Sequence, residues 1–168
     1  MQPGTIHIVF GPQGAGKTTY ARELAEEVGG TRFSIDEWMG ELFGPDLPKP
    51  MSLAWIMERV RRCEHRIWMT AANIARQGGT VVLDLGFMKI SDRSAYLALA
   101  AANAFPARLH FVTAPHDQRR RRVLSRNVEK GATFSFEVTA SMFDFMETRF
   151  EAPTEDERSK SIEQSTAS

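Results

Sequence analysis

The residues best suited to chemistry form one glycine-rich run, residues 11–18, which reads GPQGAGKT. Its spacing fits the phosphate-binding pattern G-x-x-x-x-G-K-[ST] without a mismatch. Glycines let the backbone turn tightly against phosphate oxygens, and a helix beginning near Lys17 points its positive dipole end at the same anion. We expect Lys17 to reach the β- and γ-phosphates and Thr18 to offer its hydroxyl to Mg²⁺. The expected nucleotide-binding set is Gly11, Pro12, Gln13, Gly14, Ala15, Gly16, Lys17, Thr18 and Thr19.

The segments on either side of this run have the arrangement that the motif requires. Residues 6–10 (IHIVF) are apolar and rich in β-branched side chains, which is typical of a buried strand. Residues 19–28 place Ala21, Leu24 and Val28 on one helical stripe, and the two glycines that follow end the helix. A strand, a glycine-rich loop and a helix in succession favour a nucleotide phosphate site over a simple turn.

Two aspartates follow predicted strands at the edge where this loop opens. Asp36 lies just past a short strand at residues 31–34, and Asp84 ends an apolar strand at residues 80–84. Ligands of open α/β sheets bind at the carboxyl ends of the strands, so we expect both carboxylates at the site. Asp36 could accept the proton of a hydroxyl that attacks the γ-phosphate, or it could only cap the next helix. Asp84 fits a Walker B carboxylate that holds Mg²⁺ through water, and it could instead serve the acceptor hydroxyl.

The densest charge in the chain lies in a predicted helix at residues 117–128, which contains five arginines within eight residues. Arg119, Arg122 and Arg126 share one helical face. A basic helix can bind RNA, but the net charge of the chain is zero and no aromatic platform is interleaved. We therefore favour a role in which one or two of these arginines close over the γ-phosphate as catalytic groups. Residues 131–133 should form a mobile connection in a lid.

The remaining segments continue the alternation of helices and strands. We predict helices at residues 52–77, 91–103 and 137–150, with Ser52 and Ser91 as N-caps, and a fourth strand at residues 109–113. Residues 38–50 are broken by glycine and proline and should cover the acceptor side as a loop or short helix. Trp38, Met39, Leu42 and Phe43 either line an acceptor pocket or pack it shut. Arg59, Arg62 and Arg66 on the long helix face solvent or reach an anionic acceptor.

The whole-chain properties are those of one ordinary domain. The chain has 168 residues, balanced charge and a single cysteine, Cys63, which excludes an internal disulfide and a cysteine metal cage. No apolar run approaches the roughly 20 residues that a membrane-spanning helix needs, and the N-terminus does not resemble a secretory signal. We expect a cytoplasmic enzyme with one domain at residues 1–157. The polar residues 158–168 should be a disordered tail.

Taken together, GPQGAGKTT, SIDEW, VVLDLGF, the arginine-rich segment ending at Arg126-Asn127, and MFDFMETRFEAPTEDE resemble the AAA-type predicted kinases. These are small P-loop proteins related to zeta toxins, chloramphenicol phosphotransferase and polynucleotide 5′-hydroxyl kinases. The resemblance covers residues 5–157. It implies an α/β, three-layer kinase fold with a parallel sheet of five strands in the order 2-3-1-4-5 and a helical lid. It also implies that Asp36 is the general base, that Arg119, Arg122 and Arg126 contact phosphates, and that residues 150–153 close against adenine.

These observations predict an ATP- and Mg²⁺-dependent phosphotransferase. In this interpretation the γ-phosphate moves to a hydroxyl of a metabolite, sugar or antibiotic, with Asp36, Lys17 and a lid arginine in catalytic roles. Two alternatives remain open: a nucleotide-dependent ATPase or switch that acts on a protein partner, and a polynucleotide 5′-hydroxyl kinase. The expected partner is a small molecule rather than a membrane or a nucleic acid, and the sequence does not indicate the oligomeric state.

Overall fold

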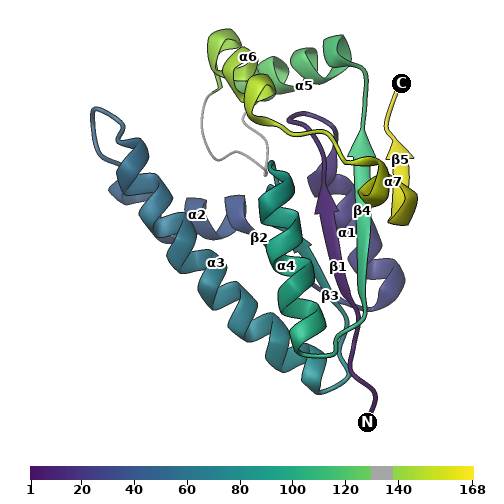
Figure 1. The fold of residues 1–168 in the computed structure, drawn as a ribbon. Coiled ribbons are helices and arrows are strands. Elements are labelled where there is room, and N and C mark those ends of the chain that lie inside the picture. Colours follow the sequence, from purple (N-terminus) through teal and green to yellow (C-terminus); the bar gives the residue numbers. More distant parts are fainter. Residues whose placement is uncertain (130–137) are drawn as a thin grey trace.

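The computed structural model describes residues 1–129 and 138–168, and its centre is a parallel sheet of five strands in the order β2-β3-β1-β4-β5 (Figure 1). This is the predicted α/β class and strand order. The strands are β1 (Ile6–Phe10), β2 (Thr31–Ser34), β3 (Val81–Asp84), β4 (Ala107–Thr113) and β5 (Ser161–Ser165).

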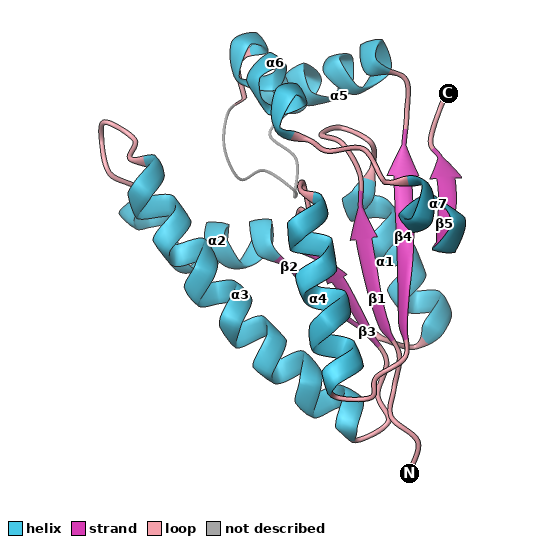
Figure 2. Cartoon of the chain, in the orientation of Figure 1, coloured by secondary structure: helices cyan, strands magenta, loops and turns pink. Residues whose placement is uncertain are grey.

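Helices cover both faces of the sheet and its carboxyl edge. In Figure 2, α3 and α4 lie on the near face, α1 lies on the far face, and α5 and α6 lie above the carboxyl ends of the strands. The helices are α1 (Lys17–Val28), α2 (Ile35–Phe43), α3 (Leu53–Arg76), α4 (Ile90–Ala102), α5 (His116–Glu129), α6 (Ala140–Arg149) and α7 (Glu155–Lys160), with a short 3-10 helix at Gly44–Asp46. The predicted lid connection at residues 131–133 and the predicted start of the last long helix at residue 137 lie outside the described residues.

The central strand explains the core. Every residue of β1 is buried, because helices cover both faces of the sheet. Ile8 and Phe10 pack in the cluster shared with α3 and α4, whereas Val9 packs with Ala21 and Leu24 of α1. Successive side chains of β1 point to opposite faces of the sheet and pack in two apolar layers. A strand covered on both faces therefore needs a nearly continuous apolar sequence.

Local capping agrees with the sequence in most places. Glycine at positive φ flanks α1 on both sides, with Gly16 at 93° and Gly29 at 60°. The hydroxyl of Ser52 accepts a hydrogen bond from the Trp55 N–H and caps α3 as predicted. The predicted cap at Ser91 is wrong: α4 begins one residue earlier, and the Asp92 carboxylate accepts the N–H of Lys89.

The largest departure from expectation is the C-terminal segment, residues 158–168, which is ordered rather than disordered. It contains the end of α7 and all of β5, which extends the sheet beyond β4 from Leu109↔Ser161 to Thr113↔Ser165. Most side chains of β5 are exposed, because β5 is an edge strand whose partner contributes backbone hydrogen bonds rather than apolar burial. Because the side chains of β5 are mostly polar, the hydrophobic pattern of the sequence does not indicate a strand there.

A buried arginine fixes this segment against the core. Arg93 of α4 is fully buried, and its guanidinium donates to both oxygens of Glu157 at 2.6 and 3.1 Å. It also donates to the Phe87 and Glu151 carbonyls and lies 4.6 Å from the centroid of the Phe10 ring. Because a buried charge needs such complete pairing, this cluster ties α4, β1 and the start of α7 together.

Candidate active site

The phosphate-binding loop, residues 11–18, connects β1 to α1 at the carboxyl edge of the sheet, as predicted. Lys17 folds back over the loop, and its Nζ donates to the carbonyls of Gly11 at 2.8 Å and Pro12 at 3.1 Å. Desolvation lowers the pKa of Lys17, and the negative charges of Asp84 and Asp36 partly oppose that shift. The ammonium group is therefore held at the loop and within the field of both carboxylates that the sequence singled out.

The two aspartates lie at the ends of adjacent strands. Ser34 of β2 and Asp84 of β3 are paired in register, and Asp36 follows Ser34 by two residues in the first turn of α2. The pKa of Asp84 is raised to about 6, because burial and the charge of Asp36 raise it by more than Lys17 lowers it. The structure thus brings Lys17, Asp36 and Asp84 into one electrostatically coupled group.

The donor set at this point fits a magnesium ion. Thr18 is in the first turn of α1, and Asp84 is 7% exposed with no hydrogen bond to its carboxylate in the described part of the chain. Mg²⁺ is typically held by one or two protein oxygens, while water and phosphate complete its shell. A hydroxyl and a largely dehydrated carboxylate beside the phosphate loop match that requirement. No larger group of acidic, histidine or cysteine side chains with metal-binding geometry occurs in the described residues.

The capping interpretation of Asp36 is wrong. The N-cap of α2 is Ser34, whose hydroxyl accepts the N–H of Glu37 at 3.3 Å. The neighbouring Glu37 takes the ion pairs, from Arg22 at 3.0 Å and from Arg32. Burial alone would raise the pKa of Glu37, but the two guanidinium groups outweigh it and hold the pKa below its usual range. Asp36 itself is exposed and has no hydrogen bond or ion pair among the described residues.

The three arginines of the predicted lid face do not share one environment. Arg119 is buried and donates to the Gln13 carbonyl at 3.2 Å, to the Ala114 carbonyl at 2.9 Å and to both oxygens of Glu147 in α6. Arg122 donates to the carbonyl of Gly14 at 3.3 Å and to Thr166. Arg126 is exposed and unpaired within the described residues, yet its charge lowers the pKa of Lys17.

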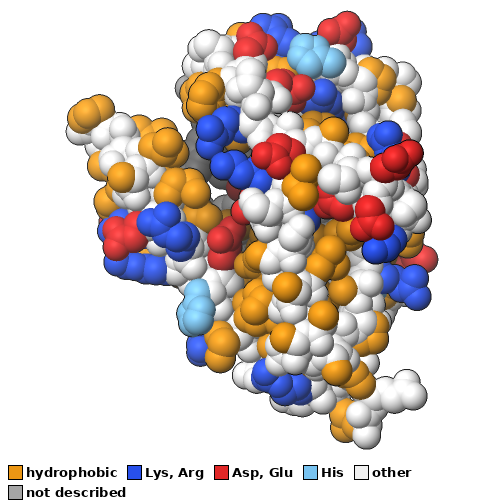
Figure 3. All heavy atoms as spheres, viewed as in Figure 1, with side chains coloured by type: hydrophobic (Ala, Val, Ile, Leu, Met, Phe, Trp, Pro, Cys, Tyr) orange, Lys and Arg blue, Asp and Glu red, His pale blue; other side chains and the backbone are white. Residues whose placement is uncertain are grey.

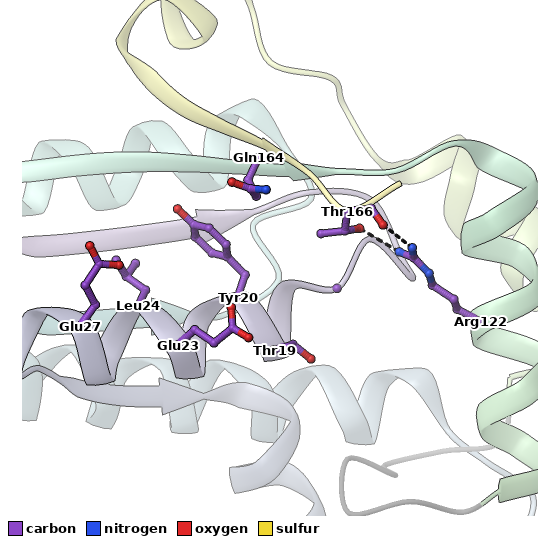
Figure 4. A pocket seen from close by; sticks show the side chains of 9 residues that line it. Thr19, Tyr20, Glu23, Leu24, Glu27, Arg122, Gln164 and Thr166 are labelled. Atoms are coloured by element: carbon purple, nitrogen blue, oxygen red, sulfur yellow. Dashed lines mark hydrogen bonds between the residues drawn. The ribbon is translucent and has the colours of Figure 1, made fainter. Parts of the chain in front are cut away.

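A pocket of about 540 Å³ adjoins the phosphate loop (Figure 4). Thr19, Tyr20 and Glu23 of α1 form one side, and Gln164 and Thr166 of the C-terminal segment face them across the opening. Gly16 and Arg122 link this space to the loop itself. The pocket therefore lies between α1 and the C-terminal segment, directly beside the phosphate-binding loop.

Three elements of this region were not found by sequence reasoning. Glu147 partners Arg119, and Thr166 contacts the loop. Glu147 lies in the segment MFDFMETRFEAPTEDE, which indicated only a family resemblance, and Thr166 lies in no motif. The third is a buried chain in which the Tyr20 hydroxyl lies 2.7 Å from His110 Nδ1, and His110 Nε2 lies 2.8 Å from His7 Nδ1. His7 is buried in β1, and its polar partner His110 is on β4, which only strand pairing brings beside β1.

In α2, most of the residues that the sequence suggested as a possible lining of an acceptor pocket pack against other side chains. Met39 is buried, the Trp38 ring lies tilted against Phe33 with the centroids 6.1 Å apart, and Phe43 meets Trp55 edge-on. Arg59 does not face open solvent, because its guanidinium lies 3.7 Å from the centroid of the Trp55 ring.

Exposed apolar side chains also gather at the end of this region. Leu42, Met51, Leu53 and Met57 are exposed at the N-terminal end of α3 and beside it, and this end stands apart from the main body in Figure 3. Every helix in the described part of the chain is too short or too polar to span a bilayer.

Comparisons with solved structures agree with this architecture. A candidate kinase from Chloroflexus aurantiacus J-10-fl has a TM-score of 0.71 and 23% identity over 91% of this chain and 80% of its own. Kti12 of Chaetomium thermophilum, in complex with ADP-AlF3, has a TM-score of 0.70 and 18% identity, over 96% of this chain and 89% of its own. A sugar kinase from Janibacter sp. HTCC2649 has a TM-score of 0.63 and 17% identity, over 98% of this chain and 86% of its own.

These likenesses show that the chain has the P-loop kinase fold, as predicted. A search of curated proteins finds no match. The sequence model described as "AAA domain" matches residues 6–153, which is most of the chain. The chain is therefore a P-loop protein that belongs to the AAA domain family.

Proposed function

We propose that this protein transfers the γ-phosphate of ATP to a hydroxyl group of a small molecule. The observation that carries the proposal is the convergence of Lys17, Asp36 and Asp84 at one edge of the sheet. Within the described residues Asp36 has no partner, while Glu37 takes both nearby arginines. A phosphate loop with a free carboxylate beside it suits a reaction in which a hydroxyl must lose its proton. The sugar kinase among the structural neighbours supports a polyhydroxyl acceptor.

The proposed chemistry uses the groups of the site as follows. Lys17 and the N–H groups of the loop bind the β- and γ-phosphates. Thr18 and Asp84 would hold Mg²⁺, which supplies charge neutralisation at these phosphates when it is bound. Asp36 takes the proton of the acceptor hydroxyl, the hydroxyl oxygen forms its bond to the γ-phosphorus, and the bond from that phosphorus to the bridging oxygen of ADP breaks. Arg126, which pairs with no group in the part of the chain that the structure describes, would meet the charge that develops on the transferred group.

The assignment of the nucleoside follows from the pocket beside the loop. Its walls continue directly from Gly16 and Thr19, so phosphates on the loop place the ribose and base between α1 and the C-terminal segment. In this proposal Arg119 and Arg122 bind the loop rather than the phosphates, which revises the roles expected of them from the sequence.

The test is isotope transfer from γ-labelled ATP. The protein is incubated with Mg²⁺ and a metabolite extract supplemented with sugars, aminoglycosides, phenicols and 5′-hydroxyl oligonucleotides, and labelled products are separated and identified by mass spectrometry. Asp36→Asn should bind ATP and fold as the wild type does, while transfer falls by about 10³-fold or more. Glu37→Gln, a neighbouring carboxylate with a structural ion pair, is the matched control and should retain transfer in the fraction that is folded.

The outcomes separate the remaining functions. Labelled small molecules that disappear with Asp36→Asn would establish the proposed reaction and identify its acceptor. Labelled oligonucleotides would instead indicate a polynucleotide 5′-hydroxyl kinase. Free labelled phosphate alone, unchanged by the substitution, would contradict a transferase and favour a nucleotide-driven switch with a protein partner.

A further inference from the structure

The carbonyl oxygens of residues 11–15, the first five of the phosphate loop, are each bound by a side chain of the protein. Lys17 donates to the first two, those of Gly11 and Pro12. The next three are bound from outside the loop: Gln13 by Arg119 at 3.2 Å, Gly14 by Arg122 at 3.3 Å and Ala15 by the hydroxyl of Thr166 at 2.6 Å. The external donors come from α5 and from the residue that follows β5.

The direction of these carbonyls decides the direction of the N–H groups. A trans peptide unit is planar, so the C=O of one residue and the N–H of the next point in opposite directions. Because Thr166 binds the Ala15 carbonyl, the Gly16 N–H points away from the C-terminal segment. In the same way, Arg119 binds the Gln13 carbonyl, and the Gly14 N–H points away from Arg119. Phosphate binding at such a loop depends on N–H groups that point together at the anion.

Thr166 is held firmly enough to act in this way. Its N–H donates to the Thr113 carbonyl at 2.8 Å and continues the β4–β5 ladder. Its hydroxyl accepts from Arg122 Nη1 at 2.8 Å while donating to Ala15, and its own carbonyl accepts from Arg122 Nη2. A Cβ on Gly16 would lie 3.5 Å from the Thr166 methyl carbon, so the side chain also packs on the loop. Figure 4 shows Arg122 reaching Thr166 from α5.

We infer that Thr166 is a positioning residue for nucleotide binding: it fixes the 15–16 peptide of the phosphate loop, and Arg122 fixes Thr166. The inference rests on the proposed function, because it assumes that nucleotide phosphates bind at this loop. Its consequence is that the C-terminal segment is part of the nucleotide site rather than an appendage to the sheet.

Three variants test the inference by calorimetric binding of ADP and of inorganic tripolyphosphate, each with Mg²⁺. Thr166→Val replaces the hydroxyl with a methyl group of similar volume, and Thr166→Ser keeps the hydroxyl. Ser161→Ala is the matched control, because it removes a similar hydroxyl-to-carbonyl bond, Ser161 to Glu157 at 2.6 Å, at the far end of β5. We expect Thr166→Val to weaken both ligands about tenfold, which is the size expected for a lost hydrogen bond with its orienting effect. Thr166→Ser and Ser161→Ala should stay within about twofold of the wild type.

Each other outcome overturns the inference. Unchanged affinity in a folded Thr166→Val protein would show that the hydroxyl does not position the loop. A loss for ADP with no loss for tripolyphosphate would make Thr166 a contact of the nucleoside. Equal losses in Thr166→Val and Ser161→Ala would indicate general loosening of β5. A wild-type protein that binds neither ligand would remove the proposed function, and the inference with it.

Discussion

Arg119 and Arg126 lie seven residues apart on the same face of α5, yet the structure places them in opposite environments. Arg119 is 7% exposed and binds two carbonyls and the carboxylate of Glu147. Arg126 is exposed, and no group among the described residues pairs with it. An arginine whose donors are all used holds the fold together, whereas one whose donors are free can meet a new negative charge. The same contrast separates Glu37, which pairs with two arginines, from Asp36, which has no partner in residues 1–129 and 138–168.

The largest effect that this contrast predicts is on catalysis at Arg126. We expect Arg126→Ala to lower kcat by about 10²- to 10³-fold, because a guanidinium that stabilises the transferred phosphate acts mainly in the transition state. The unfolding temperature should not change. Steady-state kinetics with the acceptor identified above provide the measurement, and Arg121→Ala, an exposed arginine on the same helix, is the control. Equal activity of the two variants would show that Arg126 does not stabilise the transferred phosphate.

The next effect is on stability at Arg119. Removing this side chain leaves a half-buried Glu147 carboxylate without its partner, so we expect Arg119→Ala to lower the free energy of unfolding by about 3 kcal/mol. Arg120→Ala is the matched control, because its pair with Asp144 is exposed and 3.7 Å long and should contribute less than about 0.5 kcal/mol. Urea unfolding compares them. A stable Arg119→Ala protein with lost activity would instead place Arg119 on the phosphates.

The contrast between paired and unpaired groups also predicts how stability depends on pH, through a buried histidine that has no opposite charge beside it among the described residues. Burial, followed by the charges of His7 and Arg108, lowers the pKa of His110 to about 4, so this histidine is neutral in the folded protein at pH 7. The unfolded chain binds a proton near pH 6.5, so stability should fall as the pH decreases from 6.5 to 4. The loss is on the order of 3 kcal/mol for a shift of this size. Urea unfolding of His110→Gln should show a lower stability at pH 7 and a shallower decline over that range; an equal slope would contradict the assignment.

The smallest predicted effect concerns Glu64 of α3. Its pKa is raised to about 7, because burial and the charge of Asp92 in α4 outweigh the opposing charge of Arg61. A raised pKa means that the folded state holds its proton more tightly, so stability is lost as the pH rises from about 4.5 to 7. Glu64→Gln should raise the unfolding temperature by a few degrees at pH 8 and leave it unchanged at pH 4. A shift that is the same at both pH values would show that ionisation is not the cause.

The sequence by itself determined the first four strands of the sheet and the phosphate loop. The run from Ile6 to Val28 encodes strand, loop and helix through local signals: apolar burial, glycine at positive φ and a helical stripe. The positions of Asp36 and Asp84 were also predictable, because parallel strands end at the same edge. The catalytic role of Asp36 stays a prediction.

Only the tertiary structure decided which charged groups are already paired. The partner of Arg119 is Glu147, that of Arg93 is Glu157, and that of the Ala15 carbonyl is Thr166, and each is distant in the sequence. The C-terminal strand was missed for the same reason: an edge strand is held by backbone hydrogen bonds to β4, which do not depend on the side chains that composition records. Local patterns encode periodicity and chain direction, whereas pairing depends on distances that exist only after the chain has folded.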